Sequence, residues 1–409
     1  MRLSGVARAL LAVTAVVTTT VAVVTRAAAQ GAPRGGLTIR LVSVPDHTPR
    51  GVSVYVAGTF NNWNPEAPGF QLTSLEGGQY SITLDAAVRG PVEFKFTLGS
   101  WGAVELDSTG GEIRNRSFTV PDTGSPIYEG TVARWKDPRT SAPRVSTARP
   151  TVRVLDTAFA IPQLRRTRRV WLYLPPDYAT TTKRYPVLYL QDGQNVFDAA
   201  TSFAGEWGVD ETLDSLQAAG DWGAIVVAID NGGANRSNEY HPWPSEGARF
   251  GGGEGPQYVD FIAKTLKPFI DARYRTRSDR TNTGIGGSSS GGMISFYAAL
   301  RYPDVFGRVL AFSPALFVNP EVFALARATR PLRPGSRFCL LSGRDEQVAG
   351  MTAPEFARAQ RAMADTLAAA GFDLARDVRS RLPVDGAHAE WFWRREFPVA
   401  YRWLFSDPR

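Results

Sequence analysis

The sequence predicts a chain of two folded parts, a small β-sandwich followed by an α/β part whose mostly parallel sheet is covered by helices on both faces. Two observations predict this division. Short strand-like segments separated by turn residues fill residues 36–136, whereas apolar runs alternate with amphipathic helical segments from residue 151 to residue 409. Residues 137–150 are rich in Pro, Ser and Thr and poor in apolar residues, which is typical of a linker.

The composition is that of an ordinary globular protein, with 409 residues of which 43% are hydrophobic and 21% are charged. The formal net charge is +7, but no dense run of Lys and Arg accompanies it, so we expect no nucleic-acid partner. The single cysteine, Cys339, cannot form an internal disulfide. We expect it to be a small core residue on a strand.

Residues 1–29 resemble a secretory signal peptide. Arg2 and Arg8 give a basic start, residues 9–24 are apolar, and residues 27–29 supply the small side chains that precede cleavage. The apolar run is short for a membrane span and contains threonines. We therefore expect Sec-type export with cleavage, and a secreted or periplasmic mature protein without a stable membrane span.

The pattern of residues 36–136 is that of short strands. Apolar and polar residues alternate with a period of two, as expected for strands with one buried face. The clearest strand-like segments are residues 52–56, 80–84 and 92–96. Turn residues lie between them at 76–78, 89–91 and 109–111, and this spacing favours a β-sandwich.

The sequences of residues 58–63 (Gly-Thr-Phe-Asn-Asn-Trp) and 93–101 resemble those of glycogen- and starch-binding modules, which are immunoglobulin-like β-sandwiches. In that family two tryptophans and a lysine meet a glucan chain, which here implies Trp63, Trp101 and Lys95. The alternatives are that Trp63 fills the core at a strand end, and that the module serves as a spacer or a lid.

From residue 151 onward, apolar strand-like runs alternate with segments at helical spacing. The predicted strands are 169–174, 187–190, 224–229, 308–312 and 338–341, with a further strand leading into residue 287. The predicted helices are 208–219, 258–274, 354–370 and 391–405. This alternation is typical of a mostly parallel sheet with helices on both faces.

Residues 287–291 read Gly-Ser-Ser-Ser-Gly and lie between a strand-like and a helix-like run. Gly-x-Ser-x-Gly in this context predicts a nucleophile elbow with Ser289 as the nucleophile. The glycines leave room for a tight turn, and the start of the following helix favours developing negative charge. The alternative is a Gly/Ser-rich loop without a catalytic role.

A catalytic serine needs a base and a group that orients the base. Of the three histidines, His47 and His241 lie in predicted loops, whereas His388 lies between a strand and the last helix, where the chain order Ser, acid, His places the base. The acid should follow the strand at 338–341. We favour Glu346, and Asp345 is the alternative.

The oxyanion of a tetrahedral intermediate needs two N–H donors. We assign the N–H of Ser290 and, from the loop after an early strand, the N–H of Gln194. Trp207, Trp243 and Trp391 are candidates for the rim of the substrate site, and core packing is an equal explanation for each of them.

Several motifs in residues 155–405 together resemble the putative-esterase family of α/β-hydrolases. That family includes enterochelin, feruloyl and acetylxylan esterases, S-formylglutathione hydrolase and mycolyltransferases. The resemblance implies an α/β-hydrolase fold and no metal or organic cofactor. Some members carry Thr where Arg344 stands, which leaves the choice of acid open. The motifs are residues 192–195, 207–211, 230–232, 274–276, 287–292 and 386–388.

The residues and the resemblance lead to one expected function with two alternatives. We expect a serine carboxylic-ester hydrolase that forms an acyl-enzyme with an aryl, acetyl-sugar or siderophore-type ester, as a small molecule or linked to a carbohydrate, with glucan as a further candidate partner. One alternative is an acyltransferase that uses a sugar or lipid hydroxyl in place of water. The other is a carbohydrate-binding protein without catalysis.

Overall fold

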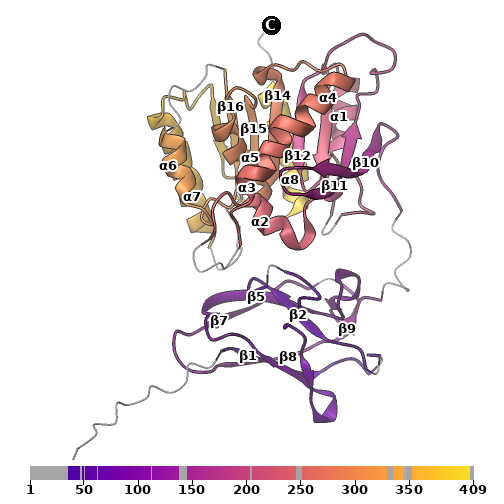
Figure 1. The fold of residues 1–409 in the computed structure, drawn as a ribbon, viewed down its shortest axis with the longest axis vertical. Helices are drawn as coiled ribbons and strands as arrows, with labels where there is room; N and C mark the ends of the chain where they lie inside the picture. Colours follow the sequence, from indigo (N-terminus) through magenta and orange to yellow (C-terminus); the bar gives the residue numbers. More distant parts are fainter. Residues whose placement is uncertain are drawn as a thin grey trace, which may run out of the picture.

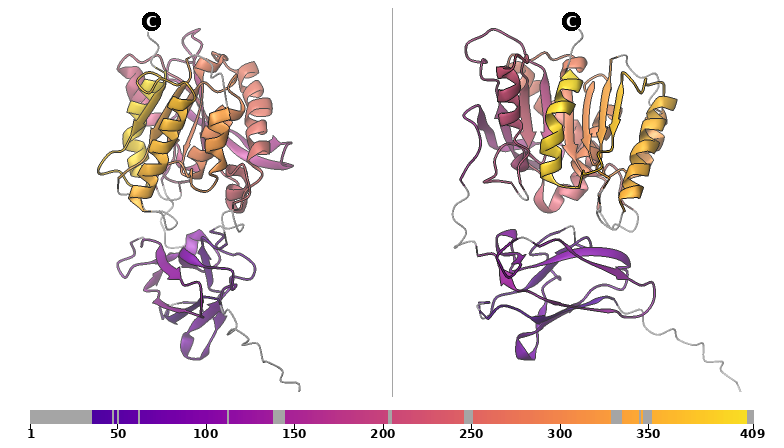
Figure 2. Two further views of the ribbon diagram at one scale, coloured as in Figure 1. Left: turned by 90° about the vertical axis from the view of Figure 1, so that its left-hand side faces the viewer. Right: turned by 180° about the vertical axis from the view of Figure 1, so that it is seen from behind.

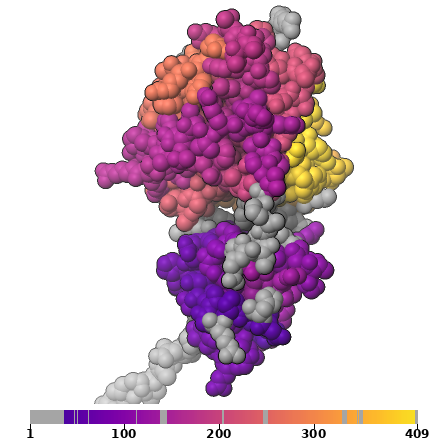
Figure 3. Space-filling view, turned by 90° about the vertical axis from the view of Figure 1, so that its right-hand side faces the viewer, coloured from indigo at the N-terminus to yellow at the C-terminus, as the bar shows by residue number. Residues whose placement is uncertain are grey.

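The computed structural model shows a β-sandwich and an α/β part that follow one another along the long axis of the molecule (Figures 1 and 2). The space-filling view shows them as two masses (Figure 3). The predicted signal peptide, His47 and the alternative acid Asp345 lie outside the residues that the structure describes. The structure describes residues 36–46, 48–49, 51–61, 63–111, 113–137, 145–202, 205–245, 251–328, 335–344, 346 and 352–405.

Strands β1 to β9 form the sandwich, in sheets of order β3-β4-β1-β8, β2-β5-β7 and β6-β9. On β5, the side chains of Val92, Phe94 and Phe96 are buried and alternate with half-buried polar residues, as the period of two predicts. The first predicted strand, residues 52–56, is shifted along the chain, because β2 begins only at Tyr55 and continues to Gly58. The bounds are β1 (Thr38–Ser43), β2 (Tyr55–Gly58), β3 (Thr73–Ser74), β4 (Tyr80–Thr83), β5 (Gly90–Thr97), β6 (Glu105–Leu106), β7 (Arg116–Val120), β8 (Ile127–Thr131) and β9 (Arg134–Trp135).

The α/β part contains an eight-stranded sheet of order β10-β11-β13-β12-β14-β15-β16-β17. Only β11 runs against its neighbours in this sheet, which confirms the predicted mostly parallel sheet. The edge strands β10 and β17 were not predicted, because many of their side chains are exposed and they lack a continuous apolar run. The bounds are β10 (Val152–Ile161), β11 (Arg166–Tyr173), β12 (Val187–Gln191), β13 (Ile225–Ile229), β14 (Thr283–Ser288), β15 (Arg308–Phe312), β16 (Arg337–Leu341) and β17 (Val378–Arg381).

Helices cover both faces of this sheet (Figure 1). Buried side chains of α3 to α7 pack on one face, and those of α1 and α8 pack on the other, together with Cys339 of β16. A π-helical turn at residues 262–266 joins α3 to α4 just before Pro268, which has no N–H to donate. Among the described residues, no helix has the length and apolar character needed to cross a membrane. The bounds are α1 (Val209–Ala218), α2 (Arg236–Tyr240), α3 (Gly255–Phe261), α4 (Lys267–Arg273), α5 (Ser290–Arg301), α6 (Glu321–Ala328), α7 (Ala353–Ala369) and α8 (Glu390–Phe405).

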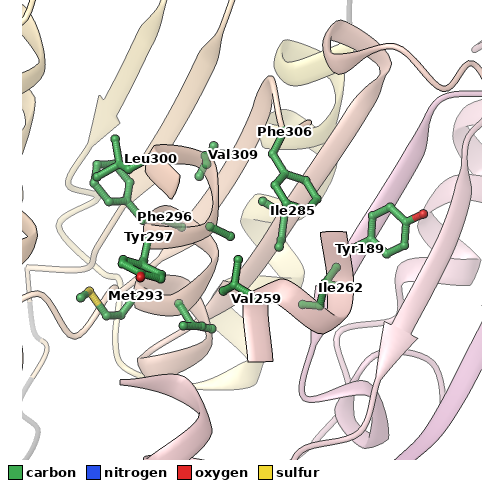
Figure 4. Close-up of a cluster of buried hydrophobic side chains, with 14 of the residues drawn as sticks. Tyr189, Val259, Ile262, Ile285, Met293, Phe296, Tyr297, Leu300, Phe306 and Val309 are labelled. Carbon is green, nitrogen blue, oxygen red and sulfur yellow. The ribbon is translucent and has the colours of Figure 1, made fainter. Parts of the chain in front are cut away.

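The order of the central strands predicts where a site should form. β12 and β14 are adjacent in the sheet, although β13 lies between them in the chain. The chain leaves β12 toward α1 on one face and leaves β14 toward α5 on the other. In open α/β sheets, sites form outside the carboxyl ends of strands at such a point. Ile285 of β14 lies in a buried cluster with Phe306 and Val309, which fixes this strand in place (Figure 4).

The segment that leads into β10 is held by carboxylates of the α/β part. The N–H of Thr147 donates to Asp198 at 3.1 Å, and its hydroxyl donates to Glu206 at 2.8 Å. The N–H of Arg149 donates to Oδ2 of Asp210 at 2.8 Å. These bonds bind the end of the predicted linker to the segment between β12 and α1 and to the first turn of α1.

The carboxyls of Asp210 and Glu211 make this contact sensitive to pH. Asp210 Oδ1 and Glu211 Oε2 are buried, and neither has a donor among the residues that the structure describes. Burial and the charge of Glu211 raise the pKa of Asp210 to about 7. A proton on Asp210 would satisfy both oxygens, because it can be donated to Glu211.

We expect Asp210→Asn to stabilise the protein more at pH 8 than at pH 4.5. The folded chain holds the proton of Asp210 up to about pH 7, whereas an unfolded aspartate loses it near pH 4, as about 3.9 is its ordinary pKa. The wild type therefore loses stability as the pH rises between these values. An amide at this position donates to Glu211 at every pH. The measurement is the thermal midpoint of unfolding at both pH values.

Asp365→Asn is the matched control, since Asp365 is an exposed carboxylate on α7. It should change the midpoint by a similar small amount at both pH values. The same midpoint change for Asp210→Asn at pH 4.5 and at pH 8 would contradict the proton on Asp210.

Candidate active site

Ser289 lies at the junction of β14 and α5, with φ 56° and ψ −127°. Such a backbone conformation is rare for a residue other than glycine and marks local strain. Its N–H donates to the carbonyl oxygen of Phe312 at 2.9 Å, and its own carbonyl oxygen accepts from the N–H of Ala315 at 3.1 Å. A Cβ added at Gly287 would lie 2.8 Å from the carbonyl carbon of Gly291, so the turn needs a glycine there. The serine side chain remains partly exposed at the end of the strand.

His388 and Glu346 are brought together at the same edge of the sheet. His388 lies in the loop between β17 and α8, and Glu346 follows β16. Nδ1 of His388 is 3.2 Å from Oε2 of Glu346, whose side chain is fully buried. The edge of Trp393 packs against the imidazole, with ring centroids 5.1 Å apart. Contact with a buried carboxylate orients an imidazole and favours a proton on Nδ1.

The second oxygen of Glu346 is also bonded. Oε1 accepts from the hydroxyl of Ser313 at 2.5 Å and from the N–H of Gly343 at 2.6 Å. The Ser313 hydroxyl in turn accepts from Nε1 of Trp393 at 2.9 Å. Charge-assisted bonds of this kind hold a carboxylate in one orientation. Ser313 could not be identified from the sequence, because a serine after a buried strand matches no motif.

The two predicted oxyanion donors lie after adjacent strands. Ser290 is the first residue of α5, after β14, and Gln194 lies in a short 3-10 helix (Gly193–Asn195) after β12. The side chain of Gln194 is fixed, since its Oε1 accepts from the N–H of Asn231 at 3.1 Å. Its carbonyl oxygen accepts from the hydroxyl of Thr201 at 2.8 Å. The two predicted donors therefore lie at the switch point of the sheet, one in a short bonded segment and the other at the start of α5.

His241 contributes a contact that the sequence did not reveal. Its Nε2 lies 3.0 Å from the hydroxyl of Ser290, and the histidine is buried. The bond ties the loop after α2 to the first turn of α5. In the sequence, His241 was recognisable only as a histidine in a predicted loop.

The three predicted rim tryptophans have different surroundings. Trp207 is buried and packs against Phe312 and Trp393 with ring centroids 5.5 and 6.0 Å apart, so its assignment to the rim was wrong. Its position beside the sheet makes it part of the core. Trp243 is half-buried, whereas the side chain of Trp391 is 52% exposed.

In the sandwich, two of the three predicted glucan-binding side chains are neighbours. The rings of Trp63 and Trp101 have centroids 6.3 Å apart and are tilted by 37°. Both side chains are half-buried. Lys95 lies on β5, on the side opposite the buried phenylalanines of that strand.

The candidate site contains the kinds of side chain that acyl transfer through a serine requires. Among the described residues, no group of three or more His, Cys, Asp and Glu side chains is arranged to hold a metal ion. A serine at an elbow, an imidazole and a buried carboxylate are the groups that such a reaction uses.

Comparison with known proteins identifies relatives of both parts. The model of the family described as Putative esterase matches residues 161–404. The uncharacterized protein YbbA of Bacillus subtilis is 29% identical over 189 residues, which are 44% of this chain and 71% of YbbA. An alpha-amylase of Niallia circulans is 43% identical over 107 residues, 26% of this chain, and this match lies in the N-terminal part. The chain spans only 8% of that amylase.

Among solved structures, the enterobactin esterase FES from Shigella flexneri has a similar fold. The similarity covers 91% of this chain and 91% of that chain, with a TM-score of 0.50 and 18% sequence identity. At this identity the comparison supports the fold, and it agrees with the predicted fold class.

We expect Ser313→Ala to lower kcat by about 10-fold or more, because the buried carboxylate of Glu346 loses a donor and a hydrogen bond to a charged group contributes about 1.5–3 kcal/mol. The measurement is turnover of p-nitrophenyl acetate, an assay suggested by the family match, with thermal unfolding in parallel.

Ser313→Gly separates the hydroxyl from the backbone. Ser313 has φ 44°, which glycine adopts without strain. Both variants lack the hydroxyl, but only glycine also relieves the backbone strain. If kcat depends on the hydroxyl, both variants should therefore lose the same share of kcat. Wild-type kcat in either variant would show that the hydroxyl does not hold Glu346 in place.

Proposed function

The chain belongs to the Putative esterase family, and on this premise we propose that it hydrolyses carboxylic esters with Ser289 as the nucleophile. The observation that carries the proposal is the 3.2 Å contact of His388 Nδ1 with Glu346 Oε2, at the edge of the sheet where β14 ends just before Ser289. A histidine oriented by a buried carboxylate is the base that a serine hydroxyl needs.

In the acylation step, Oγ of Ser289 attacks the ester carbonyl carbon while Nε2 of His388 takes the hydroxyl proton. Glu346 accepts from Nδ1 and stabilises the imidazolium that results. The N–H groups of Gln194 and Ser290 donate to the oxyanion. The bond to the alcohol oxygen then breaks, and His388 gives its proton to the leaving alcohol.

In the deacylation step, water attacks the acyl-enzyme and gives a proton to His388. The second tetrahedral intermediate collapses, the bond to Ser289 breaks as His388 returns the proton to Oγ, and the carboxylic acid leaves. A sugar or lipid hydroxyl in place of water would make the protein an acyltransferase. Analysis of the products with and without added sugar separates the two reactions, and we propose that water is the acceptor.

We propose that the substrate is a small-molecule ester that the protein hydrolyses outside the cytoplasm. The signal-like residues 1–29 support export. The similar fold of a solved esterase that acts on enterobactin supports including siderophore-type esters among the candidates. Aryl and acetyl-sugar esters are the other candidates, and a substrate panel decides among them.

We expect Ser289→Ala to lower kcat by a factor on the order of 10³ or more, because the acyl-enzyme can no longer form. The measurement is hydrolysis of p-nitrophenyl acetate, p-nitrophenyl butyrate, methyl ferulate, acetylated xylan and a trilactone siderophore. Undiminished hydrolysis of the preferred ester by this variant would rule out the proposed nucleophile.

The identity of the acid is tested by a matched pair of variants. Glu346→Gln should lower kcat on the order of 10²-fold or more, whereas Asp345→Asn should leave it within about twofold, since only the residue that orients the histidine matters. The reverse result would assign the acid to Asp345.

We propose a second activity, glucan binding, for the sandwich. Trp63 and Trp101 present two neighbouring half-buried rings. The match to an alpha-amylase, in the N-terminal part, is consistent with a carbohydrate-binding module. Aromatic rings bind sugars through the apolar faces of the pyranose, and a lysine such as Lys95 donates to the hydroxyls.

We expect Trp63→Ala and Trp101→Ala each to weaken binding of soluble starch by about 2- to 10-fold, the range that corresponds to one aromatic stacking contact. The measurement is affinity electrophoresis in gels with and without starch. Trp222→Ala is the control, because this tryptophan is 45% exposed and lies in the α/β part. Equal retardation of all variants and the wild type would exclude the two rings as the glucan site.

A further inference from the structure

The loop that carries the proposed donor Gln194 begins with a strained residue. Residues 192–196, called the oxyanion loop below, follow β12 and include the short helix Gly193–Asn195. Asp192 has φ 55° and ψ 49°, in the left-handed region that residues with a side chain rarely adopt. Such a backbone persists only where the surrounding structure fixes it.

The groups that fix Asp192 come from the segment after β13. Arg236 of α2 donates from Nε to Oδ1 of Asp192 at 2.7 Å and from Nη2 to Oδ2 at 2.9 Å. Nδ2 of Asn231 donates to Oδ1 at 2.8 Å, and the N–H of Asn231 donates to the side chain of Gln194 at 3.1 Å. A two-point bond between a guanidinium and a carboxylate fixes orientation as well as position.

The Asp192 carboxylate also contacts the segment that carries the second proposed donor. A Cβ added at Gly291 would lie 3.0 Å from Oδ2 of Asp192, so the carboxylate lies against the first turn of α5. Ser290 directly precedes Gly291. The N–H of Asp192 donates to the hydroxyl of Tyr240 at 3.2 Å, and the ring of Tyr240 lies under Arg236 at 4.9 Å. One carboxylate thus touches both donor-bearing segments.

A second carboxyl borders the loop from α8. Oε1 of Glu390 accepts from Nδ2 of Asn195 at 3.4 Å. Burial and the charge of Asp192 raise the pKa of Glu390 to about 7. Below that pH the carboxyl of Glu390 is mostly neutral. The positive charge of Arg236 is then compensated by the negative charge of Asp192 alone.

We propose that Arg236 is a positioning residue for the oxyanion hole, because its two-point bond to Asp192 fixes the oxyanion loop and with it the direction of the Gln194 N–H. The inference rests on the proposed function, since it assigns a role within the same reaction. Arg236 acts through Asp192 and has no contact with the reacting atoms in this role.

The kinetic test compares Arg236→Gln, Arg236→Lys and Asp192→Asn on a matched oxo ester and thiono ester. A misplaced N–H should lower kcat for the oxo ester about 10-fold or more with little change in KM, since loss of one oxyanion donor costs about 10²- to 10³-fold. The preference for the oxo ester should shrink, because sulfur is the weaker acceptor. Arg236→Lys should retain part of the wild-type preference for the oxo ester. The double variant of Arg236→Gln with Asp192→Asn should have a kcat for the oxo ester no lower than that of the more impaired single variant.

Arg116→Gln is the control for a general loss of stability. Arg116 makes a similar two-point bond to Glu105, from Nε to Oε1 at 3.0 Å and from Nη2 to Oε2 at 2.6 Å, but in the sandwich. This variant should keep the wild-type preference for the oxo ester. An unchanged preference in Arg236→Gln would overturn the proposal.

Hydrogen exchange gives a readout that needs no turnover. Arg236→Gln should raise amide exchange in peptides that cover residues 192–196, and Arg116→Gln should not. Wild-type exchange in Arg236→Gln would overturn the positioning role, whatever the protein hydrolyses. Turnover that does not depend on Ser289 would instead contradict the proposed function, and the exchange result would still decide whether Arg236 holds the loop.

Discussion

The strained backbone of Ser289 is the constraint on which the candidate site depends. Its φ of 56° can persist because the strand before it and the helix after it are buried, and because its N–H and C=O are bonded to residues 312–315, which comprise the last residue of β15 and the segment after it. The same segment carries Ser313, which donates to Glu346. The bonds that hold the elbow therefore also determine where the acid lies.

Parallel strands explain why these groups lie at one edge of the sheet. β14, β15, β16 and β17 are successive neighbours, and Ser289, Ser313, Glu346 and His388 follow them in that order. The carboxyl ends of parallel strands lie at one edge of a sheet, so residues far apart in the chain become neighbours. The loops after β16 and β17 also pass very close to each other, since a Cβ added at Gly343 would lie 1.9 Å from a backbone oxygen of the other loop.

The sequence could predict the features that have a local pattern. The period of two in the sandwich, the alternation of strands and helices, and the elbow around Ser289 are local patterns. The pairing of Glu346 with its histidine is not, because the position of a buried acid after a strand depends on the loop it folds into. Ser313 and Arg236 match no motif, since each acts through a partner distant in the chain. Trp207 was misassigned because a tryptophan near a strand end suits a rim and a core equally well.

The residues before β10 belong structurally to the α/β part. Thr147 is bonded to carboxylates between β12 and α1, on the stretch that follows the oxyanion loop, and Arg149 is bonded to Asp210 in the first turn of α1. The sandwich lies at the end of the α/β part where α2 is seen and where α8 begins (Figures 1 and 2). Arg236 restrains Asp192 at the start of the oxyanion loop, and Thr147 is bonded to Asp198, two residues after the loop ends. The stretch that begins with the oxyanion loop is therefore restrained by two segments that the sheet itself does not contain.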